Sequence, residues 1–405
     1  MNTSRMVWVV GFLLFLATAL NYADRLVLSI VSVDIRKEFQ LSPQDYSEVV
    51  ALFLLAYAIM YGLSGWIIDR LGTKLGFAAF ILAWSVSQAL HAFTMGKWSL
   101  ALYRFALGLS EPGNWPAAAK AVQEWFAPSD RALGIGVFNA GSSVGSAIAP
   151  PLVAWVTLQY GWRAAFVVTG LLGFGWLVAW MLIYRTGPYL AAAPAHGESA
   201  ARMNGWQIFK QRGCWSLFVA RFFTDPVIYF VIFWLPEYLR NERHFNLNEV
   251  GEYAWVPFVF GGIGYLVGGA LSSRLIQRGW TLPRSRKFVM ALGAAFLPVA
   301  ILAPFVPAAW MAIAATCFVT WGHAFWVSNL QALPTDLFRP KEIATASGFT
   351  GMGGAIGGML AQLGTGYLVA HFSYAPVFII AGLMHPLSAF LVYLWLPERE
   401  FDGAA

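Results

Sequence analysis

Charged residues are scarce in this chain. Asp, Glu, Lys and Arg make up only 11% of its 405 residues, whereas a soluble globular protein carries about 25%. Hydrophobic residues reach 59%, which excludes an ordinary soluble domain and indicates an integral membrane protein. Cysteine is nearly absent as well. Cys214 and Cys317 both stand in apolar surroundings, so we predict packing residues rather than a disulfide framework or a metal site.

Apolar stretches long enough to cross a bilayer, about 20 residues each, recur along the chain. Because a backbone in lipid must satisfy its own hydrogen bonds, each is expected to be an α-helix. We predict an all-α integral membrane protein with twelve transmembrane helices, at residues 6–31, 47–68, 75–95, 98–124, 132–158, 163–185, 213–239, 250–277, 287–306, 308–333, 342–370 and 374–396. The first stretch could be read as a signal peptide, but its length favours an uncleaved first helix.

Basic residues set the expected orientation. Lys and Arg are concentrated in alternate connecting segments, which predicts a multi-pass protein of the inner (cytoplasmic) cell membrane with both termini in the cytoplasm. This bias accounts for the net charge of +6 without a nucleic-acid partner. The longest polar connector follows the sixth span. We therefore predict an N-terminal six-helix half at 1–185, a cytoplasmic linker at 186–212 and a C-terminal six-helix half at 213–405.

The two predicted halves resemble each other. GVFNAGSSVGSAIAPPLVAWV in the fifth span has a counterpart in the eleventh, GFTGMGGAIGGMLAQLGTGYLVA. Small residues recur on one face of both helices, which allows another helix to approach closely. Parallel repeats of this kind place a substrate site between the halves, near the middle of the membrane.

The stretch GLSGWIIDRLGTKLG at the end of the second span resembles a loop motif of the major facilitator superfamily, G-x-x-x-D-R-x-G-x-[RK]. The matching residues are Gly65, Asp69, Arg70, Gly72 and Lys74. We expect the glycines to permit a tight turn, and Asp69 to belong to a gating latch that breaks as the halves rock. A positive-inside loop would explain only the basic residues. The second-half copy, GGALSSRLIQRG, has Ser273 in place of the acid, so a latch there is expected to be weaker or absent.

Several charged residues lie where hydrocarbon is expected, and such residues are costly enough to mark a functional site. Besides Lys120 and Asp225, they are Asp24, Arg25, Arg104 and Glu111. Arg104 and Glu111 are spaced i, i+7 and therefore share a helix face. At 1.5 Å per residue, both arginines lie roughly 10 Å below the outer surface and Glu111 roughly 20 Å below it. We predict that the two guanidinium groups face one cavity.

Two buried guanidinium groups need anions beside them. Asp24 and Glu111 supply part of that balance, and the remainder favours an anionic substrate, because the planar fork of Arg binds a carboxylate with two hydrogen bonds. A closed structural ion-pair network is the alternative. Burial favours the neutral form of Glu111, and a neighbouring Arg favours the charged form. We therefore predict Glu111 as the main proton-coupling site and Asp24 as a second one.

Six stretches resemble the hexuronate transporters of the anion:cation symporter family: NYADR, GLSEPGNWPAAAKAVQEWF, FNAGSSVGSAIAPPLVAW, FTDPVIYFVIFWLPEYL, GHAFWVSNLQALPTDLF and GGAIGGML. The resemblance implies a major facilitator fold and proton-coupled import of a sugar-acid monoanion such as glucuronate or galacturonate, with protons as the coupling ion and no cofactor. It also implies site residues. Tyr22, Arg25 and Arg104 match substrate-side positions, Asp24 and Glu111 match protonatable ones, and Asn139, Ser142, Ser143, His323, Trp326 and Asn329 match polar or aromatic cavity positions.

Two residues depart from the family pattern. Ala324 stands where a Gln is expected, and Thr350 stands at a substrate position where aldonate transporters carry Asn. Hydroxyl recognition is therefore expected to be altered. An aldonate or other organic-anion symporter, a passive uniporter and a sensor of the same fold stay open as alternatives.

Several residues have competing structural interpretations. His323 either donates to sugar hydroxyls or packs as a satisfied core residue. Lys120 and Glu124 are spaced i, i+4, which predicts a local ion pair rather than transport chemistry. Asp225 before Pro226 is interpreted as structural, with proton transfer as the alternative. No HExxH motif and no paired Cys ligands occur, so neither enzymatic activity nor a metal is expected. We expect a monomer surrounded by membrane lipid.

Overall fold

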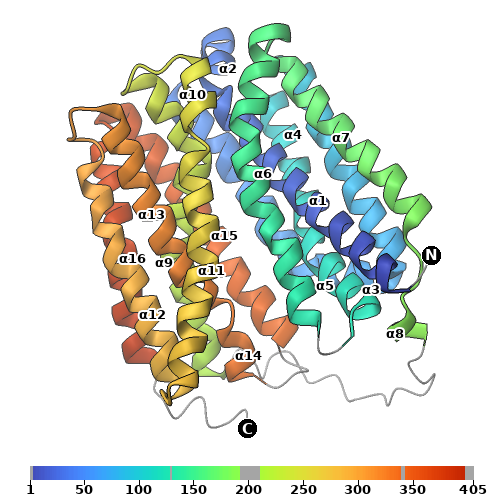
Figure 1. The fold of residues 1–405 in the computed structure, drawn as a ribbon. Coiled ribbons are helices and arrows are strands. Elements are labelled where there is room, and N and C mark those ends of the chain that lie inside the picture. The colour runs from blue at the N-terminus through green and yellow to red at the C-terminus, as the bar shows by residue number, and fades with distance from the viewer. Residues whose placement is uncertain (1–2, 128–129, 192–209, 339–342, 397–405) are drawn as a thin grey trace. The chain divides into compact units, whose positions relative to one another are not determined.

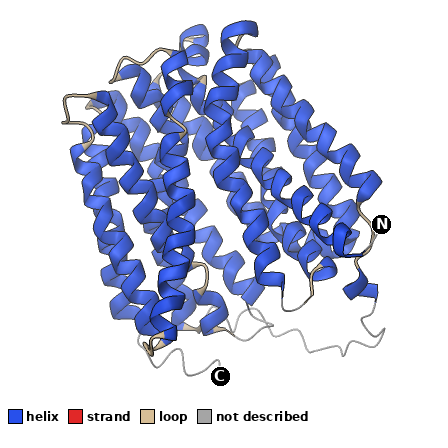
Figure 2. Cartoon of the chain, in the orientation of Figure 1, coloured by secondary structure: helices blue, strands red, loops and turns tan. Residues whose placement is uncertain are grey.

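The computed structural model describes residues 3–127, 130–191, 210–338 and 343–396. These residues form helices and short connections, with no strand among them (Figure 2). Figure 1 labels most of the helices. The first part of the chain forms α1 (Thr3–Ile30), α2 (Ser32–Phe39), α3 (Pro43–Leu90), α4 (Lys97–Ser110), α5 (Asn114–Trp125), α6 (Arg131–Tyr160), α7 (Trp162–Ile183) and α8 (Pro188–Ala191). The remainder forms α9 (Arg212–Asn241), α10 (Leu247–Tyr253), α11 (Val256–Gln277), α12 (Leu282–Phe296), α13 (Ala309–Leu330), α14 (Leu333–Leu337), α15 (Ile343–His371) and α16 (Ala375–Trp395).

Nine helical stretches in the described part of the chain are long and apolar enough to cross a membrane. One of them, Pro43–Phe93, covers the predicted span 47–68 and all but the last two residues of the predicted span 75–95. The predicted spans 98–124 and 342–370 are not among the nine. The first of these is divided between α4 and α5 by the 3₁₀ turn η2 (Glu111–Gly113) and carries several charges. The all-α fold is thus confirmed, whereas the count of twelve spans stays a prediction.

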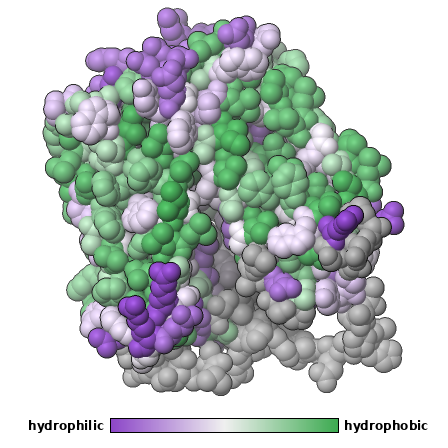
Figure 3. Space-filling model, in the orientation of Figure 1, coloured by the Kyte–Doolittle hydropathy of each residue, from purple (hydrophilic) through white to green (hydrophobic). Residues whose placement is uncertain are grey.

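Hydrophobic side chains cover the outward faces of α6 and α11, and hydrophilic residues concentrate near helix ends (Figure 3). The exposed hydrophobic side chains include Ile148 and Trp155 on α6 and Ile263 and Leu266 on α11. Apolar helix faces of this kind are stable in lipid rather than in water.

The two glycines of the loop motif, Gly65 and Gly72, differ in backbone conformation. Within α3 the only non-helical backbone is at Gly72, with φ of 74°, a left-handed conformation that glycine adopts without steric cost. The predicted turn is therefore present at Gly72. Gly65 lies in the continuous helical run before it, so its assignment to the turn is wrong: the helix does not end until the left-handed residue.

The chain divides into two compact units. Unit 1 comprises Met1–Leu41, Leu52–Ala200 and Phe245–Trp255, and unit 2 comprises Ser42–Ala51, Ala201–His244 and Val256–Ala405. Two short segments thus belong to a different unit from their neighbours in sequence. Part of the predicted linker, 192–209, lies outside the described residues. The half boundaries at 185 and 213 stay a prediction.

Both units contain the same close helix crossing. In unit 1, a side chain at Gly141 or Gly145 of α6 would collide with the carbonyl oxygens of Phe15 and Ala19 on α1. In unit 2, Gly353 and Gly357 of α15 stand in the same relation to the carbonyl oxygens of Phe218 and Phe222 on α9. The close approach predicted from the repeated small residues is confirmed in each unit.

Polar contacts connect Glu38 of α2, which lies outside the spanning stretches, to the first two residues of α7. Arg163 Nη2 donates to Glu38 Oε1 (2.6 Å) and Trp162 Nε1 donates to Glu38 Oε2 (2.8 Å). These hydrogen bonds lower the pKa of Glu38, because they stabilise the charged carboxylate.

Candidate functional site: a buried arginine and carboxylate cluster in unit 1

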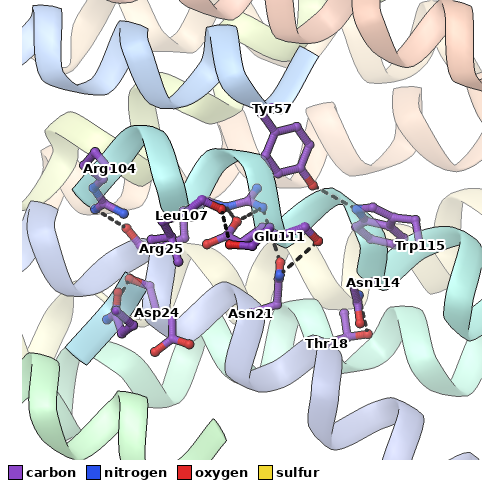
Figure 4. A network of polar contacts seen from close by, with 12 residues as sticks. Thr18, Asn21, Asp24, Arg25, Tyr57, Arg104, Leu107, Glu111, Asn114 and Trp115 are labelled. Carbon is purple, nitrogen blue, oxygen red and sulfur yellow. Dashed lines mark hydrogen bonds and ion pairs between the residues drawn. The ribbon is translucent and has the colours of Figure 1, made fainter. Parts of the chain in front are cut away.

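An ion pair between α1 and η2 forms the centre of the cluster (Figure 4). Arg25 Nη2 lies 2.6 Å and Arg25 Nε 3.1 Å from Glu111 Oε2. Arg25 is 2% exposed and Glu111 is fully buried. Asn21 completes the contact, because its Oδ1 accepts from Arg25 Nη2 (3.3 Å) and its Nδ2 donates to the Glu111 carbonyl (3.4 Å). The pairing of Arg25 with Glu111, expected only as charge balance, is a direct contact.

Arg104 lies beside this pair. Its Nη2 donates to the backbone carbonyl of Arg25 (3.1 Å), and both guanidinium groups lie over the ring of Phe53, at 5.4 Å for Arg104 and 5.6 Å for Arg25. Arg104 is fully buried. The predicted proximity of the two arginines is therefore present, but their side chains are enclosed rather than open to a cavity.

Asp24 faces away from the arginine pair. Its carboxyl group is fully buried, and neither of its oxygens accepts a hydrogen bond from a residue that the structure describes. Gln88 lies nearby and donates from Nε2 to the Asp24 carbonyl (3.3 Å) and to the Thr169 hydroxyl (2.9 Å). A buried carboxyl group without donors is much more stable neutral than charged.

Aromatic rings enclose the Arg25 guanidinium. Tyr22 lies 4.8 Å and Tyr57 4.9 Å from it, measured to the ring centroids, and a cation gains stability over such faces. Trp115 Nε1 donates to the Tyr57 hydroxyl (2.9 Å). Tyr22 was expected here, whereas Asn21, Tyr57 and Trp115 were missed. Asn21 and Trp115 lie inside the quoted stretches NYADR and GLSEPGNWP, next to predicted residues, so their polar groups were a usable signal.

The predicted polar residues of α6 have no recorded hydrogen bond to the arginine cluster. Asn139, Ser142 and Ser143 are half-buried, and the Ser142 hydroxyl donates to the Asn139 carbonyl (2.7 Å) within the helix. Their glycine neighbours bring α6 against α1, the helix that carries Arg25. The structure therefore places them on a helix next to the cluster rather than within it.

The remaining predicted residues belong to unit 2. His323 and Trp326 on α13 are buried, and His323 Nδ1 lies 3.1 Å from Nε2 of His385 on α16. Thr350 is buried and donates to the Ser347 carbonyl (3.0 Å). His385 was missed, although it too falls in the middle of a predicted span. A groove of about 110 Å³ between α9, α15 and α16 is lined by none of the predicted site residues.

Asn329 belongs to a different polar group from His323. Arg286 Nη1 donates to Asn329 Oδ1 (3.4 Å) and to the Ser272 hydroxyl (3.3 Å), while Arg286 Nε binds Asp336 Oδ2 at 3.0 Å. This ion pair takes its acid from α14 rather than from the motif position at Ser273, and the expectation that a second-half latch is weaker or absent stays a prediction.

The loop motif of unit 1 contains an ion pair to α5. Lys120 Nζ lies 2.7 Å from Asp69 Oδ1. The expected pair between Lys120 and Glu124 is wrong, because Glu124 instead accepts hydrogen bonds from the hydroxyl groups of Thr73 and Tyr184. The other basic residues of the motif play local parts. The Arg70 guanidinium lies 4.2 Å from the ring centroid of Trp66, and the Lys74 carbonyl accepts from Trp180 Nε1 (3.0 Å).

Asp225 forms an ion pair within α9. Its Oδ2 lies 2.8 Å from Arg221 Nη2, and Gly354 of α15 packs so closely on its carboxyl group that a side chain there would collide with it. Among the residues that the structure describes, no group of three or more His, Cys, Asp or Glu could hold a metal ion.

Apolar helices of spanning length, together with ion pairs buried between them, define a multi-pass membrane protein. The family model of the Major Facilitator Superfamily matches residues 14–362 and 279–404, and the chain belongs to this superfamily. Because this family and the relatives below are transporters, the expectation that the chain is not an enzyme is confirmed.

Individual relatives show which transporters of the superfamily the chain resembles. The hexuronate transporter of Escherichia coli (strain K12) is 32% identical over 409 residues, which cover 97% of this chain and 94% of the relative. The galacturonate transporter of Dickeya chrysanthemi is 32% identical over 303 residues, or 71% and 88% of the two chains. The resemblance to hexuronate transporters is therefore confirmed. The inward-facing, unoccupied structure of a bacterial homologue of the human lysosomal transporter Spinster aligns with a TM-score of 0.75 at 20% identity over 98% and 94% of the chains, which shows the shared fold.

Proposed function

We propose that this protein imports a hexuronate monoanion, glucuronate or galacturonate, together with protons by alternating access. The observation that carries the proposal is the fully buried contact between Arg25 and Glu111, with Arg104 beside it. A buried guanidinium group next to a protonatable carboxyl group can bind either that carboxylate or a substrate carboxylate. The two relatives described above transport anions of this class.

The geometry suggests how proton and substrate are coupled. Glu111 now occupies the Nε and Nη2 edge of Arg25 through one oxygen. A proton on Glu111 removes its charge and weakens this contact, since hydrogen bonds between charged groups are about twice as strong as neutral ones. The freed edge of Arg25 then binds the substrate carboxylate. Loss of the proton on the cytoplasmic side restores the pair and displaces the substrate.

Asp24 is proposed as a second proton site. Its carboxyl group is fully buried, and the structure records no hydrogen bond to either oxygen from a described residue. It is adjacent in sequence to Arg25, whose partner Glu111 takes the first proton. The number of protons carried per substrate follows from whether Asp24 titrates during the cycle.

The other expected site residues are proposed to contact the sugar part of the substrate. Tyr22 contributes an aromatic face, and the half-buried polar groups of α6 contribute hydrogen bonds. In unit 2, the corresponding residues are His323, Trp326, Asn329 and Thr350. We further propose that the Asp69 loop acts as a gate, that the protein works as a monomer in lipid, and that it lies in the inner membrane with both termini in the cytoplasm.

Uptake of labelled glucuronate into proteoliposomes tests the proposal, with and without an inward proton gradient. We expect accumulation above equilibrium only when the gradient is present, and competition by galacturonate. Uptake that reaches only equilibrium, equally with and without the gradient, would indicate a uniporter. Transport of galactonate but not of glucuronate would indicate an aldonate carrier. Arg25→Lys is the matched variant: it keeps the charge but loses the planar fork, so apparent affinity should fall.

A further inference from the structure

Two buried histidines of unit 2 share one hydrogen bond. His323 Nδ1 on α13 and His385 Nε2 on α16 are 3.1 Å apart, and the two rings are nearly perpendicular, with an interplanar angle of 76°. His385 is fully buried, whereas His323 retains 3% exposure. His323 is therefore the member of the pair that retains accessible surface.

The ring of Trp326 also lies beside the His385 ring. Trp326 lies one helical turn after His323 on the same face of α13, and its ring centroid is 5.6 Å from that of His385. The second ring nitrogen of His385, Nδ1, has no hydrogen-bond partner among the described residues. The only polar contact of His385 that the structure records is thus the one to His323.

This arrangement restricts the positions of the ring protons. We consider both rings neutral, because burying a charged imidazole is costly. Two proton arrangements remain. If His385 Nε2–H donates, His323 Nε2 also carries a proton and His385 Nδ1 is a bare acceptor. If His323 Nδ1–H donates, His385 Nδ1 carries a buried proton without an acceptor, and His323 Nε2 is bare.

The first arrangement is the more stable. A buried N–H group without an acceptor is rarer in proteins than an acceptor that is left unused. In the first arrangement, the outer nitrogen of the pair, His323 Nε2, is a hydrogen-bond donor.

We propose that His385 is a positioning residue that holds His323 in the Nε2–H tautomer, so that His323 presents a donor to an oxygen acceptor of the substrate. This inference rests on the proposed function for the identity of that acceptor, a hydroxyl or ring oxygen of the sugar acid. It assigns His385 a part in substrate selection that involves no direct contact with the substrate.

Nitrogen chemical shifts test the tautomer without any substrate. Protein labelled with ¹⁵N-histidine in detergent micelles gives separate signals for protonated and bare ring nitrogens, and His323→Gln identifies the His323 signals. We expect the Nε2–H form of His323 in the wild type and a mixture of tautomers in His385→Phe. An Nδ1–H form in the wild type, or an unchanged tautomer in His385→Phe, would overturn the proposal.

Transport tests the consequence. His385→Phe keeps the ring but loses the donor, and His385→Asn loses it with a smaller, polar side chain that serves if the Phe variant fails to fold. His385→Gln restores an amide N–H near the Nε2 position. We expect the first two to raise the apparent KM for glucuronate at similar kcat by the inverse of the remaining Nε2–H fraction, about twofold for an equal mixture of tautomers, and His385→Gln to recover it.

The His323→Gln background separates positioning from a general structural effect. The amide that this substitution introduces keeps an N–H donor that needs no tautomer, so His385→Phe should no longer raise the KM there. An equal rise in both backgrounds would overturn the proposal. If the wild type does not transport glucuronate, the proposed function fails, while the nitrogen shifts still decide the tautomer.

Discussion

Glu111→Gln removes the charge that balances Arg25 while it keeps the size of the side chain. Full loss of a partner in a buried ion pair costs roughly 3–5 kcal/mol. Gln still offers a carbonyl oxygen to Nε and Nη2 of Arg25, which now contact one Glu111 oxygen at 3.1 and 2.6 Å. The change therefore replaces charged hydrogen bonds by neutral ones, and we expect the free energy of unfolding to fall by about 1–2 kcal/mol.

The transport phenotype of this variant is more specific than its stability. A permanently neutral residue at 111 leaves Arg25 able to bind substrate but cannot carry a proton. In proteoliposomes, Glu111→Gln should therefore exchange internal for external glucuronate and fail to accumulate it against a proton gradient. Thermal unfolding in detergent, followed by tryptophan fluorescence, measures the stability change on the same preparation.

A double variant provides the control. Arg25→Met with Glu111→Leu replaces the whole pair by apolar side chains of similar volume, a change that is often neutral or stabilising for a buried ion pair. We expect this variant to unfold near the wild-type temperature and to transport nothing. Full gradient-driven accumulation by Glu111→Gln would refute the coupling role of Glu111, and transport by the double variant would show that the pair is structural only.

Three further changes test other parts of the structure. Asp69→Asn breaks the exposed pair with Lys120, so it should cost at most about 1 kcal/mol of stability but slow transport, as should Lys120→Gln in the same assay. Gly145→Leu should lower the unfolding free energy by about 1–3 kcal/mol through collision with α1, whereas Gly136→Leu, which meets no atom within 4 Å, should leave it unchanged in thermal unfolding. Glu38→Gln should lower the free energy of unfolding at neutral pH by at most about 1 kcal/mol, because the pair is exposed. The lowered pKa of Glu38 means that its contribution is present above the ordinary glutamate pKa and is lost as the pH falls through the folded-state value, so the two proteins should unfold alike in acid.

The buried arginine and carboxylate cluster of unit 1 could be predicted in part from two properties of an α-helix, its rise per residue and its period. The rise per residue gave Arg25 and Arg104 similar depths, and the helical period put Arg104 and Glu111 on one face. The same reasoning could not choose which of Asp24 and Glu111 pairs with Arg25. That choice depends on the rotation of α1 about its axis, which packing against other helices determines.

Contacts between distant segments were beyond sequence reasoning. Lys120 was paired with the neighbour one helical turn away, yet its partner is Asp69, 51 residues earlier. His385 offered no local signal to connect it with His323, 62 residues before it. Helical spacing describes neighbours within one helix, whereas these contacts depend on which faces of two helices meet.

The repeated glycine crossing differs between the two units at one neighbouring position. With Gly141 and Gly145 aligned on Gly353 and Gly357, Ser142 of the first unit corresponds to Gly354 of the second. Gly354 has no room for a side chain because the Asp225 carboxyl group fills that place. A hydroxyl-bearing residue at 354 is therefore compatible with the fold only if Asp225 is replaced by a smaller residue.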